Sequence, residues 1–202
     1  MFFEMEGIDG AGKSTQCDLL KVYFDSLGID STIIKELNST EFSKQVRNIL
    51  ITDMMKDPHA EMFLFLSCKC QVFSQLISPS LEAGRIVIGD RGSGSFISYN
   101  SSILGMSRNE LESLLKLCSF GHHPDLTILL DVPVEVARER ILKKDGQTRF
   151  DLVSPDILSK QREKFLELAA SSPGWVVIDG TESIQSVEST IRRNITEVMG
   201  KV

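Results

Sequence analysis

The chain has 202 residues, 42% of them hydrophobic, which suits one domain, residues 1–202, with a core of its own. Its 22 basic and 28 acidic side chains give a net charge of −6, which argues against proteins that wrap nucleic acid or bind anionic membranes. The longest apolar runs have about five residues, too short for a membrane span, and residues 1–6 do not have the basic and apolar pattern expected of a signal peptide. We therefore expect a cytoplasmic protein with neither membrane nor nucleic acid as a partner.

Five short segments rich in β-branched and aromatic residues predict strands. In chain order they are Phe2–Glu6, Ser31–Lys35, Arg85–Asp90, Leu126–Asp131 and Trp175–Asp179. Segments with helical patterns lie between them. Strands that alternate with helices predict an α/β fold with a parallel sheet covered by helices on both faces.

Capping residues mark where the helices begin and end. A helix from Lys13 to Leu27 is followed by Gly28, which suits the C′ position. Asp57 and Pro58 start a long apolar-periodic helix that ends near Gly84, with a bend expected at Pro79. Three further helices are predicted: one after a capping box at Ser107–Glu110, one opening at Ser154-Pro155, and one from about Ser183 to Met199.

The first strand leads directly into a sequence that fits the phosphate-binding pattern G-x-x-x-x-G-K-[ST]. Glycines let backbone N–H groups turn toward an anion at a helix N-terminus, the lysine reaches the β- and γ-phosphates, and the serine can bind Mg²⁺. A glycine-rich turn with a surface lysine is the alternative. The strand–loop–helix context favours ATP binding, by Gly7, Gly10, Ala11, Gly12, Lys13, Ser14 and Thr15.

A metal at this loop needs a carboxylate from the end of a neighbouring strand. Asp90 and Asp131 both end predicted strands. We favour Asp90, because Arg91 follows it and adds a cation at the same edge of the sheet, whereas Asp131 precedes the turn at Val132-Pro133. Either acid could instead cap a helix.

A run of cations follows the fourth predicted strand. Residues 138–149 hold five basic and two acidic side chains in a protein of net charge −6. The run could be a solvated helix face. Beside a phosphate loop whose variable positions carry no cation, we favour a lid, at about residues 143–153, that brings positive charge to the phosphates on closing.

The cysteines and the paired histidines receive simpler interpretations. Cys68 and Cys70 could suggest a metal, but no second Cys or His pair has suitable spacing. We therefore expect all four cysteines to be buried and reduced. His122 and His123 precede Pro124 and are expected to be loop residues.

Three groups of residues closely resemble the thymidylate kinase (dTMP kinase) family. They are the loop from Phe3 to Thr15, the pair Asp90-Arg91, and Pro124–Thr127 with Leu130–Val132, and the likeness extends from Phe2 to about Thr181. The resemblance implies a P-loop NTPase three-layer sandwich with a five-stranded parallel sheet and a short lid. It also implies transfer of the γ-phosphoryl group of ATP to dTMP with Mg²⁺, and a homodimer, which we expect to form through the helix of Asp57–Gly84.

The family's functional positions carry over as follows. Asp9 helps to place the acceptor sugar and Arg91, which lies between the two phosphate groups. Arg47 matches an arginine on the acceptor phosphate, and Phe65 matches the aromatic ring that stacks on thymine. The remaining positions are Lys69 at the thymine edge, Ser95 and Tyr99 in the acceptor wall, and Arg149 in the lid signature Arg149-Phe150-Asp151. Lys13, Arg91, Asp9 and Arg149 are the expected catalytic residues, and Ser14 and Asp90 the expected metal ligands.

Several base-reading positions depart from the family pattern. Lys69 replaces an arginine, Gly92 a tyrosine and Asn100 a glutamine, and the stretch Lys35–Thr40 replaces Arg-Glu-Pro-Gly-Gly-Thr. Lysine lacks the planar fork of arginine, so a base carbonyl would be recognised less strictly. A kinase for another pyrimidine monophosphate such as dUMP, and a nucleotide-binding paralogue without activity, therefore stay open beside dTMP kinase.

Overall fold

A computed structural model describes residues 1–52, 57–143, 148 and 150–200 of the chain. The strands are β1 (Phe2–Glu6), β2 (Ser31–Lys35), β3 (Ile86–Asp90), β4 (Leu126–Asp131) and β5 (Trp175–Asp179). The helical segments are α1 (Lys13–Ser26), α2 (Glu41–Ile51), α3 (Pro58–Val72), the π-helical η1 (Phe73–Ile77), α4 (Ser78–Glu82), α5 (Ser93–Leu104), α6 (Arg108–Cys118), α7 (Val134–Leu142), α8 (Pro155–Ser171) and α9 (Ile184–Met199).

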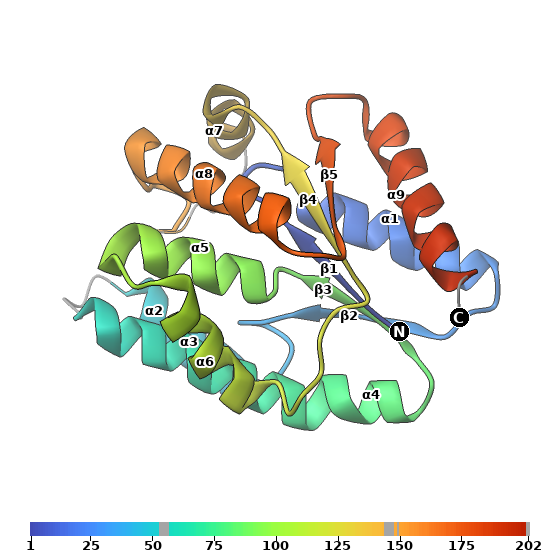
Figure 1. The fold of residues 1–202 in the computed structure, drawn as a ribbon, viewed down its shortest axis with the longest axis horizontal. Coiled ribbons are helices and arrows are strands. Elements are labelled where there is room, and N and C mark those ends of the chain that lie inside the picture. Colours follow the sequence, from blue (N-terminus) through green and yellow to red (C-terminus); the bar gives the residue numbers. More distant parts are fainter. Residues whose placement is uncertain (53–56, 144–147, 149, 201–202) are drawn as a thin grey trace.

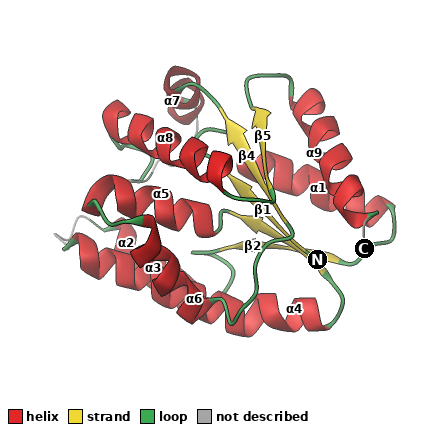
Figure 2. Ribbon diagram, in the orientation of Figure 1, coloured by secondary structure: helices red, strands yellow, loops and turns green. Residues whose placement is uncertain are grey.

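The strands form one parallel sheet in the order β2-β3-β1-β4-β5, with helices on both faces (Figures 1 and 2). Helices α1 and α9 cover one face, and α3, α5 and α8 lie on the other. This confirms the predicted fold class and all five strands, the third of which begins one residue later than expected. In the described part of the chain, no helix is long and apolar enough to cross a membrane.

Strand β1 lies at the centre of the sheet, and its side chains alternate between the two helical layers. Phe3 stacks on Phe24 of α1, with ring centroids 6.4 Å apart. Phe2 meets Phe73 of η1 edge-to-face at 6.2 Å. Glu4 and Glu6 therefore share the face of Phe2, so two buried acids point toward the layer that holds α3 and α5.

The long helix predicted between Pro58 and Gly84 is present, but it consists of three consecutive segments along the lower side of Figure 1. Proline at position 79 has no N–H, and its ring would clash with the carbonyl of residue 75 in a regular α-helix. The π-helical turn Phe73–Ile77 directly precedes it and widens the backbone there. The capping box at Ser107 and Glu110 is confirmed at the start of α6.

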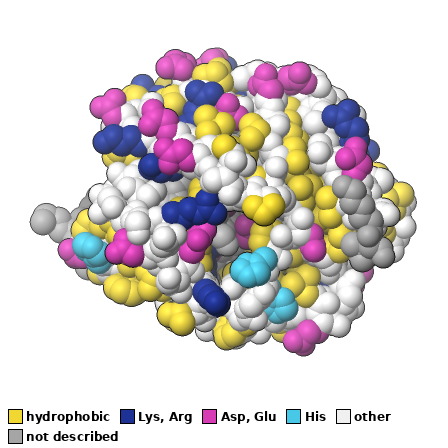
Figure 3. All heavy atoms as spheres, viewed as in Figure 1, with side chains coloured by type: hydrophobic (Ala, Val, Ile, Leu, Met, Phe, Trp, Pro, Cys, Tyr) yellow, Lys and Arg dark blue, Asp and Glu magenta, His cyan; other side chains and the backbone are white. Residues whose placement is uncertain are grey.

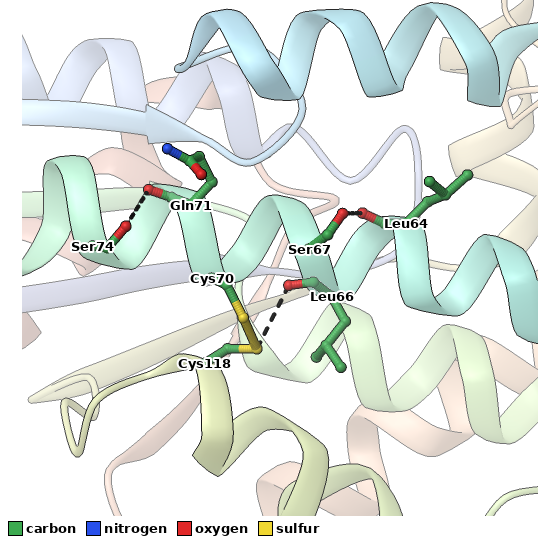
Figure 4. The surroundings of a disulfide bond; sticks show 7 residues. All are labelled: Leu64, Leu66, Ser67, Cys70, Gln71, Ser74 and Cys118. Atoms are coloured by element: carbon green, nitrogen blue, oxygen red, sulfur yellow. Dashed lines mark hydrogen bonds between the residues drawn. A yellow bond between two sulfur atoms is a disulfide. The ribbon is translucent and has the colours of Figure 1, made fainter.

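The expectation that all four cysteines are reduced is wrong for two of them. Cys70 of α3 and Cys118 of α6 form a disulfide (Figure 4), and only Cys17 and Cys68 are free. Cys70 and Cys118 are 48 residues apart in the sequence, so their spacing gave no sign of a contact. The packing of α3 on α6 brings their Cα atoms to within 4.3 Å of each other. Cys68 and Cys70 point to different sides of α3, because two residues turn a helix by about 200°.

Candidate active site

The phosphate loop follows β1 at the carboxyl edge of the sheet, where ligands bind in open parallel sheets. Gly7, Gly10 and Gly12 all have positive φ angles, of 139°, 82° and 100°. A Cβ atom on Gly7 would lie 2.5 Å from the Leu130 carbonyl oxygen, and one on Gly10 2.3 Å from that of Ala137. Glycine is therefore required at both positions by the backbone behind the loop, as well as by the turn itself.

Lys13 is buried against its own loop. Its ammonium group donates to the carbonyl oxygens of Gly7 and Ile8, both at 2.8 Å. Burial, followed by the charge of Arg91, lowers the pKa of Lys13 from 10.5 to about 8. The side chain is therefore charged at neutral pH and is held where a phosphate on the loop would meet it.

Ser14 and Asp90 come together beside the loop. The Ser14 hydroxyl donates to Asp90 Oδ2 at 2.7 Å, and Lys35 lies 3.4 Å from the same oxygen. Asp131, the other candidate acid, accepts two hydrogen bonds from Arg162 of α8, at 2.6 and 2.8 Å. The geometry thus favours Asp90 as the carboxylate that completes a cation site with Ser14.

Arg91 connects the phosphate loop to α5. One end of its guanidinium group pairs with Asp9, and Nη1 donates to Ser95 Oγ at 3.2 Å. Burial alone would lower the pKa of Arg91, but the charges of Asp9, Glu6 and Asp90 raise it, so the group is a permanent cation. Three residues that the resemblance assigns to the acceptor side therefore form one connected group.

An aromatic cluster lies on the acceptor side. The ring of Phe65 on α3 contacts Tyr99 on α5, with centroids 6.2 Å apart, and Phe150 at 5.9 Å. Phe65 was expected to stack on the base and Tyr99 to line the acceptor wall, and the structure brings the two rings together. Phe150 follows the predicted lid arginine, so this part of the lid segment packs on the same aromatic ring.

Three other expected site residues remain, of which the structure describes two. Arg47 lies half-buried on α2, and among the described residues no hydrogen bond or ion pair joins it to Arg91 or Phe65. Arg149 and residues 144–147 of the predicted lid lie outside the described residues. Lys69 is buried, pairs with Glu36 at 3.3 Å, and donates to the Gly92 carbonyl oxygen at 3.0 Å.

The sequence interpretation missed a group of buried acids behind Arg91. Glu6 Oε1 accepts from the N–H groups of Gly92 and Ser95, at 3.0 and 2.8 Å. Glu4 accepts from the Ser93 N–H at 3.3 Å. Burial raises the pKa of Glu4 to about 8, with Glu6 adding to the effect, and burial also raises the pKa of Glu36 against the charge of Lys69. The sequence does contain a sign of this group, because Glu4 and Glu6 lie in an otherwise apolar strand, and buried acids need hydrogen-bond partners.

Arg140 of α7 was noted only as part of the basic run. It donates to the Gly180 carbonyl oxygen at 2.9 Å and to that of Gly10 in the phosphate loop at 3.4 Å. The basic segment therefore contacts the back of the loop. On the face shown in Figure 3, acidic and basic side chains are interspersed, whereas the cations Lys13 and Lys69 are buried within the site.

Comparison with known proteins agrees with this geometry. A model of the thymidylate kinase family matches residues 5–191. The chain is 34% identical to a thymidylate kinase of Thermosipho melanesiensis, with 98% of this chain and 99% of that protein aligned. It is 36% identical, over the full length of both chains, to a probable thymidylate kinase of Thermococcus kodakarensis. A probable thymidylate kinase of Thermococcus onnurineus is 37% identical over 95% of each chain. The chain belongs to the thymidylate kinase family.

Proposed function

We propose that the protein transfers the γ-phosphoryl group of ATP to dTMP, giving dTDP and ADP. The observation that carries this proposal is the arrangement at the carboxyl edge of the sheet. There the phosphate loop with Lys13 stands beside Ser14 and Asp90, and Arg91 reaches from Asp9 to Ser95. Membership of the family supports dTMP as the acceptor.

The two substrates are both polyanions, so the main task of the site is to hold them together. The acceptor phosphate has a second pKa of about 6 and is already a nucleophile at neutral pH, so no general base is needed. Lys13 offsets charge on the donor phosphates, and Arg91 offsets charge between donor and acceptor. Phe65 offers a ring face to the base, and the lid arginine Arg149 adds a further cation on closing.

Magnesium is the metal that these ligands suit. Ser14 and Asp90 offer a hydroxyl and a carboxylate oxygen 2.7 Å apart, and Mg²⁺ prefers a few such oxygens together with phosphates and water. Among the described residues, no group of three or more His, Cys, Asp or Glu side chains forms a metal cage of its own. Bound Mg²⁺ would neutralise charge on the β- and γ-phosphates.

The wider organisation follows from the same assignment. We treat residues 1–202 as one kinase domain because the five strands make a single sheet. The helical segment from Pro58 to Glu82 remains our candidate for a homodimer interface, on which Phe63 is 56% exposed. We propose a cytoplasmic location, where ATP is available as the donor.

An acceptor screen tests the proposal. With MgATP, we measure ADP production with dTMP, dUMP, UMP, CMP and AMP, and identify the diphosphate formed. We expect dTMP to have the highest kcat/KM and Arg91→Ala to abolish most of the turnover. The burial of Lys69 and the glycine at position 92 favour a second candidate, a kinase for dUMP, which a higher kcat/KM for dUMP would establish. Thermal stabilisation by nucleotides without any ADP would instead indicate a binding protein.

A further inference from the structure

The backbone that follows β3 has an unusual conformation at the residue proposed for catalysis. Arg91 has a φ angle of +80°, in the left-handed region that side chains other than glycine rarely adopt. Such a conformation costs free energy and persists only where the surroundings enforce it. The groups that enforce it therefore help to determine where the guanidinium group points.

Buried acids hold one side of this backbone. Glu6 takes the N–H groups of Gly92 and Ser95, and Glu4 takes that of Ser93. These contacts fix the start of α5 directly after Arg91. Both carboxyl groups belong to β1, so these hydrogen bonds attach the start of α5 to the central strand of the sheet.

Lys69 holds the other side. Its ammonium group donates to the Gly92 carbonyl oxygen at 3.0 Å and lies 3.3 Å from Glu36 Oε2. The residue is only 4% exposed, so both partners compensate a charge that is buried. A cavity of about 20 Å³ borders Lys69, Glu36 and Gly92, which is room for about one water molecule and far too little for a pyrimidine ring.

Glycine at position 92 belongs to the same arrangement. A Cβ atom there would lie 2.0 Å from the carboxyl carbon of Glu4. The missing side chain thus makes room for the acid that receives the Ser93 N–H. Two departures from the family pattern, Lys69 and Gly92, meet at one hydrogen bond.

From these contacts we infer that Lys69 is a positioning residue, which holds the Gly92 backbone and through it the Arg91 side chain, and does not read the acceptor base. The inference rests on the proposed function, because it concerns how Arg91 is held for phosphoryl transfer. It replaces the role that the resemblance assigns to position 69.

Steady-state kinetics of Lys69→Met separates the two roles. Displacing a catalytic group by about 1 Å can reduce turnover 100-fold, so we expect kcat to fall at least about 10-fold. The KM for dTMP, and the ratio of kcat/KM between dTMP and dUMP, should stay within about twofold. Lys69→Arg keeps a charged donor and should recover most of kcat. Lys116→Met, the same change at an exposed lysine of α6, is the control.

The opposite division of effects would overturn the inference. In that case Lys69→Met would have a kcat within about twofold of the wild type, together with a raised KM for dTMP or an altered ratio of kcat/KM between dTMP and dUMP. Rates are expressed per folded protein, with the folded fraction measured by circular dichroism. If the rate falls only because fewer molecules are folded, kcat per folded protein is unchanged, and this outcome also contradicts the inference. If Lys69→Met does not fold, Glu36→Gln removes the charge that pairs with Lys69 and is judged by the same criteria.

A second measurement does not depend on the acceptor. In a crystal structure of Lys69→Met, or of Glu36→Gln in its place, we expect Arg91 to leave its left-handed conformation or its contact with Asp9. If both features are retained, the inference is wrong even where the kinase assignment holds. If the wild-type protein phosphorylates no monophosphate, the proposed function fails, and this structural comparison still decides the role of Lys69.

Discussion

The proposed donor and acceptor halves of the site are built in different ways. The donor half is nine consecutive residues, Gly7–Thr15, whose glycine backbone and one lysine form the phosphate loop. The acceptor half collects side chains from α3, α5, the end of β3 and the segment around Phe150. The first is one continuous stretch of backbone that packs against the carbonyl groups of Leu130 and Ala137, whereas the second is assembled entirely by tertiary packing. Substitutions at its ring positions, such as Phe65, should therefore affect binding of the acceptor more than binding of ATP.

The donor half should be sensitive to a single side chain. Lys13→Ala removes the ammonium group that we propose contacts the donor phosphates, and we expect kcat to fall about 10³-fold, since loss of one charge-stabilising group has effects of this order. A coupled assay of ADP production measures the loss. Lys21→Ala, on the same helix but paired with Asp25, should keep near-normal turnover. Equal activity of the two variants would contradict the assignment of the loop.

This contrast explains how far the sequence could be interpreted. A motif of nine residues between a strand and a helix determines its own geometry, so the loop was predictable in detail. The five strands were predictable because buried parallel strands are short apolar runs. Asp90 was also favoured from the sequence over Asp131, and the bidentate contact of Asp131 with Arg162 supports that choice.

What the sequence did not reveal depends on contacts between distant residues. Helix α5 begins with Ser-Gly-Ser, which has low helix propensity, and is fixed at its N-terminus by Glu4 and Glu6 of β1. The Cys70–Cys118 disulfide exists because α3 packs on α6. A spacing pattern does not show that Lys69 is turned toward a backbone carbonyl. Each of these features belongs to the acceptor half.

The disulfide tests whether the acceptor half depends on tertiary packing. Cys118→Ser removes a cross-link that closes a loop of 48 residues, and we expect the free energy of unfolding to fall by about 4 kcal/mol. Because α3 carries Phe65, the KM for dTMP should rise more than the KM for ATP. Urea denaturation and steady-state kinetics measure the two effects. Wild-type protein treated with a reductant should behave like the variant, and resistance of its stability to both changes would count against the cross-link.

Removing the ring of Phe65 should sharpen the distinction between the halves. Stacking of a base on an aromatic ring is worth about 1–3 kcal/mol, so we expect Phe65→Ala to raise the KM for dTMP about 10-fold. The KM for ATP should change less than about twofold. Phe42→Ala, which removes an exposed ring from α2, away from the candidate dimer interface, is the matched control. A rise in the KM for ATP alone would show that Phe65 serves the other substrate.

The smallest expected effect is on the pH dependence of stability, and it comes from the buried acid Glu4 of β1. Burial, and then the charge of Glu6, raise the pKa of Glu4 from 4.5 to about 8, so the folded protein keeps a proton that the unfolded chain releases above pH 4.5. The stability that this proton contributes is complete below pH 4.5 and is lost as the pH rises toward 8.

We therefore expect the free energy of unfolding of the wild type to fall relative to that of Glu4→Gln by about 1 kcal/mol between pH 6 and pH 7. Glutamine keeps an oxygen for the Ser93 N–H but cannot ionise, so the comparison isolates the proton. Glu82→Gln, which changes an exposed acid, should run parallel to the wild type. Lys13 affects stability in a different pH range. Because its pKa is lowered from 10.5 to about 8, its contribution to the free energy of unfolding falls as the pH decreases from 10.5 toward 8. Parallel profiles for wild type and Glu4→Gln between pH 5 and pH 8 would mean that Glu4 is ionised in the fold, and that Gly92 faces a charged carboxylate.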